Sequence, residues 1–331
     1  MNRRNATTAL LLGLFGFGAT RRAAMAQQAA KVYRIGYLST PTRESVQRGV
    51  EAFVRKLREL GWIEGQNLII EYRWAEGDIT KLPQFALELI RDNVDLIVAP
   101  AGSAALAAKK ATSTIPIVMI FPSDPVELGL VANLRRPGGN VTGTTFTSDS
   151  EIFGKQLQIL KEALPRASRV AVLWNPADAS FGVQARPVEA AARALKIHLQ
   201  HVEARGPEQF EPAFSTMARG RAEALVISGS STFLAHRARL AELALRGRLP
   251  TMVSFREMVE AGGLLAYGVN MADFVGRSAV YVDKILKGAK PADLPVEQPT
   301  MFELVINLRT AKALGIEMPQ SLLLRADEKF E

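Results

Sequence analysis

The stretch that decides the fold is PVEQPTMFELVINLRTAKALG, residues 295–315. Its two prolines keep the first part extended and exclude it from a central position in a ladder of strands. Residues 302–306 have the composition of a strand, and residues 307–314 predict a short helix that Gly315 ends. We therefore expect a connecting segment that becomes regular structure only at its far end.

The chain before this stretch alternates strand and helix signals. Short, continuous apolar runs are typical of strands that are covered on both faces, as in a parallel sheet. The strands expected in the first half are residues 32–38, 67–74, 96–99 and 117–120. Between them, apolar residues recur at helical spacing, for example from Val46 to Leu60, where Gly61 follows. This alternation predicts an α/β fold.

The second half of the chain repeats the order of the first. Residues 35–38 correspond to 170–173, and residues 96–99 correspond to 225–228. Two further matches, each involving proline or paired glycines, keep the same order. Four matches in sequence predict two similar lobes.

The N-terminus has the order of features that marks a secretory signal peptide. Arg3 and Arg4 precede an apolar run over residues 9–15, and AMA at residues 24–26 is a small-x-small cleavage pattern. We expect residues 1–26 to be a signal peptide that follows either the general secretory or the twin-arginine route. The alternative is an irregular cytosolic N-terminus. Because the sequence has no cysteine, an exported chain would carry no lipid anchor and would be soluble in the periplasm.

Charge and motifs exclude several functions. The net charge is +8, and removal of four arginines with the leader would leave +4, with basic residues scattered among acidic ones. This pattern argues against nucleic acid as a partner. The sequence has no G-x-S-x-G, P-loop or H-E-x-x-H motif, and its three histidines lack a carboxylate at metal-ligand spacing. We expect a monomer with no enzymatic activity, no cofactor and no metal.

Several motifs occur in the order in which one protein family has them. They are LGWIEGQN (60–67), DPV (124–126), RPGGNVTG (136–143), PADLP (291–295), the opening stretch and PQSLLLRADE (319–328). Over nearly all of the chain after the leader, the sequence resembles the ABC transporter substrate-binding proteins often labelled tryptophan/tyrosine type.

This resemblance implies the type I periplasmic binding protein fold. In that fold two Rossmann-like α/β lobes with parallel sheets are joined by a three-segment hinge and close on a small ligand. The expected lobes are residues 27–145 with 271–298 for lobe 1, and 146–270 with 299–331 for lobe 2. The crossings would lie near Thr145, Val269 and Thr300, so the opening stretch would be the third.

Candidate ligand-binding residues follow from the topology. In open parallel α/β sheets, ligands bind beyond the carboxyl ends of the strands. The candidates at or just after the expected strands are Ser39, Thr40, Gly102, Ser103, Phe121, Asp124, Asn175, Asp178, Ser230, Phe255 and Tyr267.

Each candidate has a binding role and an ordinary structural alternative. Gly102-Ser103 and Ser230-Ser231 open helices whose free N–H groups suit a carboxylate, although serine is also a common N-cap. Asp124 is the first choice as partner of a ligand ammonium, and its alternative is a turn before Pro125. Asp178 could pair with the same ammonium or cap a helix. The three aromatic candidates could face a ligand ring or the core.

The resemblance implies a function in transport. We expect a periplasmic substrate-binding protein that delivers a small solute to an ABC importer, with the permease in the inner membrane as its partner. The family label suggests an aromatic amino acid or a related carboxylate as the ligand. The alternative is a periplasmic ligand-sensing protein coupled to a membrane signalling kinase, because the same fold would serve that role.

Overall fold

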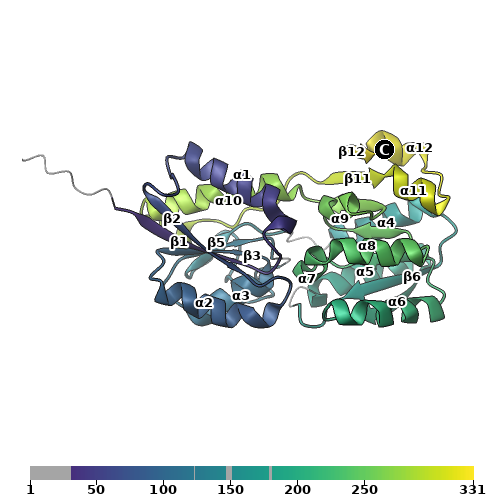
Figure 1. Cartoon of the computed structure of the whole chain (residues 1–331), viewed down its shortest axis with the longest axis horizontal. Helices are drawn as coiled ribbons and strands as arrows, with labels where there is room; N and C mark the ends of the chain where they lie inside the picture. Colours follow the sequence, from purple (N-terminus) through teal and green to yellow (C-terminus); the bar gives the residue numbers. More distant parts are fainter. Residues whose placement is uncertain (1–30, 123, 147–150, 179–180) are drawn as a thin grey trace, which may run out of the picture. The chain divides into compact units, whose positions relative to one another are not determined.

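The computed structural model describes residues 31–122, 124–146, 151–178 and 181–331. The chain from Tyr33 to Glu331 is one unit that contains two β-sheets (Figure 1). The predicted signal peptide lies outside the described residues, as do residues 147–150, which follow the predicted crossing near Thr145.

The first sheet is parallel throughout and has the strand order β2-β1-β3-β4-β5. Its strands are β1 (Tyr33–Ser39), β2 (Leu68–Trp74), β3 (Leu96–Pro100), β4 (Ile117–Ile120) and β5 (Val141–Gly143). Helices α1 (Gln47–Glu59) and α10 (Met271–Leu286) cover one face. Helices α2 (Leu82–Arg91) and α3 (Gly102–Ala111) cover the other. Both faces are therefore covered, as the continuous apolar runs predict.

The second sheet has the strand order β12-β11-β10-β9-β8-β6-β7. Its strands are β6 (Arg169–Trp174), β7 (His198–Glu203), β8 (Ala224–Ile227), β9 (Thr251–Val253), β10 (Leu265–Gly268), β11 (Glu303–Asn307) and β12 (Glu328–Phe330). The helices on one face are α4 (Glu151–Ala163), α5 (Phe181–Leu195), α11 (Leu308–Leu314) and α12 (Gln320–Arg325). Those on the other face are α6 (Phe210–Arg219), α7 (Ser231–Ala235), α8 (Arg237–Arg246) and α9 (Arg256–Glu260). The two mostly parallel sheets confirm the predicted α/β class.

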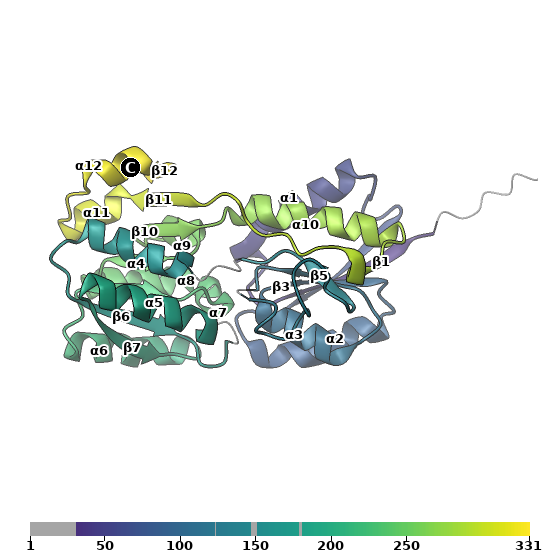
Figure 2. The ribbon, with the colours of Figure 1, turned by 180° about the vertical axis from the view of Figure 1, so that it is seen from behind.

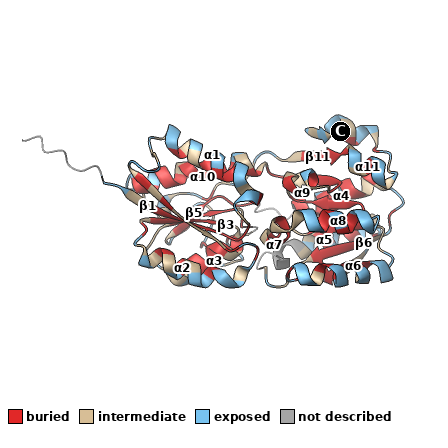
Figure 3. Ribbon diagram, viewed as in Figure 1, coloured by how far each residue is buried: buried red, intermediate tan, exposed pale blue. Residues whose placement is uncertain are grey.

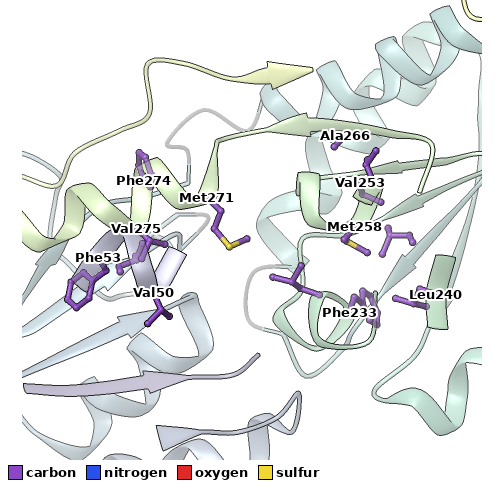
Figure 4. Packing of buried hydrophobic residues seen from close by; sticks show 14 of the residues in the cluster. Val50, Phe53, Phe233, Leu240, Val253, Met258, Ala266, Met271, Phe274 and Val275 are labelled. Carbon is purple, nitrogen blue, oxygen red and sulfur yellow. The ribbon is translucent and has the colours of Figure 1, made fainter. Parts of the chain in front are cut away.

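The core follows from the alternation of side chains along buried strands. In β3, Leu96 and Val98 pack with residues of α1 and α10, whereas the residues that alternate with them pack with α2 and α3. Figure 4 shows Val50, Phe53 and Val275 lying together between α1 and α10. Figure 3 shows the same pattern over the whole sheets, with buried strands under helices that expose one face.

One strand pair departs from the predicted parallel arrangement. Strands β10 and β11 are antiparallel, and Gly268 pairs with Glu303. Gly268 is the last residue of β10 before the chain continues to α10, and Glu303 is the first residue of the returning strand. Because the departing and returning segments are neighbours in the sheet, they run in opposite directions.

The opening stretch forms the expected strand and helix. After β11, the Asn307 side chain accepts a hydrogen bond from the Thr310 N–H at 2.9 Å and caps α11. Gly315 ends the helix with φ of 71°. Before β11, the Glu297 carbonyl accepts from the Thr145 N–H at 2.9 Å, next to β5. Residues 298–302 therefore connect the two sheets (Figure 2), and the proposed lobe limits remain a prediction.

The longest helix in the described residues, α10, has 16 residues. No helix among them combines the length and the apolar character needed to cross a bilayer.

Candidate functional site

A pocket lies where the carboxyl ends of strands from both sheets approach one another. Strands β1, β3, β4, β6, β8 and β9 each supply a residue at or after their ends, namely Ser39, Pro100, Phe121, Asp178, Gly229 and Phe255. The pocket holds about 730 Å³ of space that atoms do not fill, counted with the solvent at its mouth. This position agrees with the strand-end rule used on the sequence.

Aromatic rings form much of the wall. Phe146 stacks on Phe153 with ring centroids 6.0 Å apart and meets Phe255 edge to face at 6.2 Å. Phe121 stacks on Phe274 at 5.2 Å. Rings held in this way offer both faces and edges to a planar apolar group, so the wall suits an aromatic ligand.

Tyr37 contributes a phenol to the wall. It lies in β1, and its ring centroid is 5.8 Å from that of Phe53 and 5.6 Å from that of Trp74. Burial raises the pKa of Tyr37 far above its usual value, with the nearby Tyr72 adding to the effect. The phenol therefore stays protonated and can donate a hydrogen bond. Sequence reasoning missed this residue, although it lies two positions before Ser39 and so on the same face of the strand.

The start of α3 forms a polar part of the pocket. Gly102 lines the wall, and the N–H groups of the first turn have no acceptor among the described residues, as at any helix start. The preceding Ala101 has φ of 70° and ψ of 158°, and its N–H donates to the Ile120 carbonyl at 2.6 Å. This tie fixes the direction of α3, whose positive end therefore lies at the pocket.

Buried hydroxyls from both sides lie in or next to the wall. Ser39 lines the pocket, and its residue is 1% exposed. Thr40 and Ser230 are buried and adjoin wall residues in the chain. Within the described chain, none of these three hydroxyl oxygens has a hydrogen-bond partner. A buried polar group left unpaired costs about 1–3 kcal/mol, so the Ser39 hydroxyl, which lines the pocket, favours a polar ligand.

Asp178 supplies charge. Of the described residues that line the wall, Asp178 alone carries a charged side chain, and this residue is only partly buried. Its N–H donates to the Asn175 carbonyl at 3.0 Å, and the Asn175 side chain accepts from the Ala177 N–H at 2.9 Å. Asn175 thus builds the turn that presents Asp178.

The sequence candidates divide into two groups. The structure places Ser39, Gly102, Phe121, Asp178 and Phe255 in the wall. Those outside the wall are Thr40, Ser103, Asp124, Asn175, Ser230 and Tyr267.

Asp124, the first choice for an ammonium, has a structural role. Its Oδ1 atom accepts from the N–H groups of Val126 at 2.9 Å and Glu127 at 3.0 Å. This is the turn before Pro125 that the sequence offered as the alternative. Tyr267 likewise packs on Phe302, with ring centroids 5.9 Å apart.

Sequence reasoning also missed two wall phenylalanines and the start of α10. Phe146 and Phe153 line the pocket, as do Met271 and Val275. Phe153, Leu157 and Leu160 follow helical spacing in α4, and by itself this pattern indicates only a core-facing stripe. The described residues contain no cluster of three or more His, Cys, Asp or Glu side chains able to hold a metal ion.

Comparisons with known proteins match the chain to one protein family. Residues 32–330 match the family model described as ABC transporter substrate binding protein. A tyrosine-binding protein of Clostridioides difficile (strain R20291) is 26% identical over 287 residues, which cover 87% of this chain and 82% of that protein.

Two solved structures are also similar. A conserved domain protein from Vibrio cholerae has a TM-score of 0.85 at 27% identity, over 90% of this chain and 100% of that chain. An ABC domain from Streptococcus pneumonia in complex with L-Trp has a TM-score of 0.84 at 25% identity, over 91% of this chain and 100% of that chain.

Proposed function

Because the chain belongs to the family of ABC transporter substrate binding proteins, we propose that it binds an aromatic amino acid in the pocket and delivers it to an ABC permease. The observation that carries the choice of ligand is the wall itself. Its described residues combine four phenylalanines with one carboxylate and the open start of a helix. A tyrosine-binding relative and a similar structure that holds L-Trp support the same ligand class.

Each part of an aromatic amino acid would find a partner in the pocket. The ring would lie among Phe121, Phe153 and Phe255. The carboxylate would accept hydrogen bonds from the first turn of α3 and from the Ser39 hydroxyl. The ammonium would pair with Asp178, which replaces Asp124 in this role. The ligand would thus be held at both charged ends and along its ring.

Delivery to a permease requires that the protein meet its ligand outside the inner membrane. The basic, apolar and AMA-ending order of residues 1–26 supports export to the periplasm. The permease in the inner membrane is then the expected partner, as for a member of this family.

Calorimetry on the mature chain, residues 27–331, tests the ligand. The protein is unfolded and refolded first, so that any ligand retained from the cell is removed. We expect L-tryptophan, L-tyrosine or L-phenylalanine to bind more tightly than L-leucine, which lacks the ring. Tryptamine and indole-3-propionate, which lack one charged end each, should both bind more weakly than L-tryptophan. Preference for L-leucine, or no binding of any aromatic amino acid, would refute the assignment.

A further inference from the structure

A buried hydrogen bond joins the two sheets' loops outside the pocket wall. The Thr232 hydroxyl donates to the Gly77 carbonyl at 2.8 Å, between residues 155 positions apart in the chain. Thr232 lies in α7 and is 2% exposed, and Gly77 lies in the turn after β2. Neither residue lines the pocket. The contact is therefore separate from the ligand-binding wall and from the chain crossings.

The second-sheet side of this contact is oriented by Asn175. The Asn175 Nδ2 atom lies 3.4 Å from the Thr232 oxygen, and Asn175 is itself buried. Its Oδ1 atom already accepts from the Ala177 N–H. An amide N–H can only donate, so the Thr232 oxygen accepts from Asn175 and its own proton is left for Gly77.

The first-sheet side is tied to the pocket edge. The Gly77 N–H donates to the Thr40 carbonyl at 2.7 Å, and the Ala75 N–H donates to the Ser39 carbonyl at 2.8 Å. Gly77 has φ of 88°, and a Cβ at this position would lie 3.1 Å from the His236 Nε2 atom. The turn thus fits closely against the end of α7 and is hydrogen-bonded to the end of β1.

We propose that Gly77, Asn175 and Thr232 form a latch that holds the two lobes closed in a fraction of the ligand-free molecules. Closing without the Thr232 hydroxyl would leave the Gly77 carbonyl buried and unpaired. The closed-to-open ratio should then fall about 5- to 150-fold. The apparent affinity for the ligand falls with the fraction of molecules in the closed, binding-competent form. This consequence alone rests on the proposed function.

Distances between two labels test the latch without any ligand. Since the chain has no cysteine, Lys110→Cys on α3 and Leu245→Cys on α8 introduce two unique sites for spin labels. Both residues are exposed. Thr232→Val keeps the shape of the side chain and removes the hydroxyl, Thr232→Ser restores it, and Thr216→Val is the matched control. The Thr216 hydroxyl donates at 3.0 Å to the Pro212 carbonyl of its own helix.

In ligand-free protein we expect Thr232→Val to move label pairs from the shorter to the longer distance. Thr232→Ser and Thr216→Val should keep the distribution of the parent. Cooperative thermal melting checks that each variant is folded, and Thr232→Ala is the second variant should the valine not fit. A distribution in Thr232→Val identical to that of the parent would overturn the latch.

Titration with L-tryptophan separates this proposal from the proposed function. A parent protein whose distances do not respond to L-tryptophan contradicts the ligand, whereas the ligand-free comparison still decides the latch. If both proposals hold, Thr232→Val should need more L-tryptophan to reach the shorter distance.

Discussion

Asp178→Asn is the substitution that tests the ligand's charged end most directly. The change keeps the size of the side chain and removes the negative charge of the described pocket wall. A hydrogen bond to a charged group contributes about 1.5–3 kcal/mol, and a fully buried ion pair that loses one partner can cost about 3–5 kcal/mol. Asp178 is only partly buried, and Asn still offers an oxygen to the ammonium. We therefore expect a loss of about 1–2 kcal/mol, or roughly 5- to 30-fold in the Kd for L-tryptophan.

Asp124→Asn is the matched control for this experiment. It removes the same charge, but its Oδ1 atom can still accept from the Val126 and Glu127 N–H groups, so the turn is kept. Calorimetry should give this variant the affinity of the parent. Indole-3-propionate, which has no ammonium, should bind parent and Asp178→Asn alike, and the two ligands together form a cycle that isolates the pair. Equal affinity of parent and Asp178→Asn for L-tryptophan would refute the assignment of Asp178.

Two further outcomes follow from the structure and one from the sequence. Gly77→Ala should lower the free energy of unfolding, measured in urea, by more than Gly65→Ala does. Both glycines have positive φ, and this left-handed backbone alone costs an alanine about 1–2 kcal/mol. Of the two positions, only Gly77 has a neighbour within 4 Å of an added Cβ. Burial lowers the pKa of His236, against a smaller opposing effect of Glu208, so the folded state favours the neutral ring; its stabilisation is present above about pH 6.5 and is lost as the pH falls below that value. The fall in unfolding free energy between pH 7 and pH 5 should therefore be smaller in His236→Gln than in the parent, and equal falls would contradict this. Mass spectrometry of the periplasmic protein should give a chain that begins at or near Gln27, and a chain that retains Met1 would contradict the signal peptide.

The sequence predicts most of the fold because its signals are local. The continuous apolar run at residues 96–99 indicates a strand buried on both faces, and β3 is such a strand. Gly315 marks the end of a helix, and it adopts the left-handed conformation there. The antiparallel pairing of β10 with β11 carries no such local signal, because it depends on where the returning chain enters the sheet.

The site was harder to predict, because strand-end position does not fix the direction of a side chain. Asp124 and Asp178 both follow a strand within a few residues and both belong to turns. In one turn the Asp124 carboxylate accepts the backbone N–H groups of Val126 and Glu127. In the other the Asn175 side chain accepts the Ala177 N–H, and Asp178 lines the pocket wall. Only the folded turns distinguish the two carboxylates.

Backbone strain at the pocket is a second property that no local pattern reveals. Ala101 and Phe121 both line the pocket with positive φ, 70° and 66°, a conformation that costs a residue with a side chain about 1–3 kcal/mol. The Ala101 N–H donates to the carbonyl of Ile120, the residue before Phe121, so one hydrogen bond links the two strained positions. This arrangement turns the start of α3 and the ring of Phe121 toward the same space. The neighbouring strands and α3 must hold both residues in this strained conformation. The strain therefore lies at the part of the pocket where the ring and the carboxylate of the proposed ligand would meet.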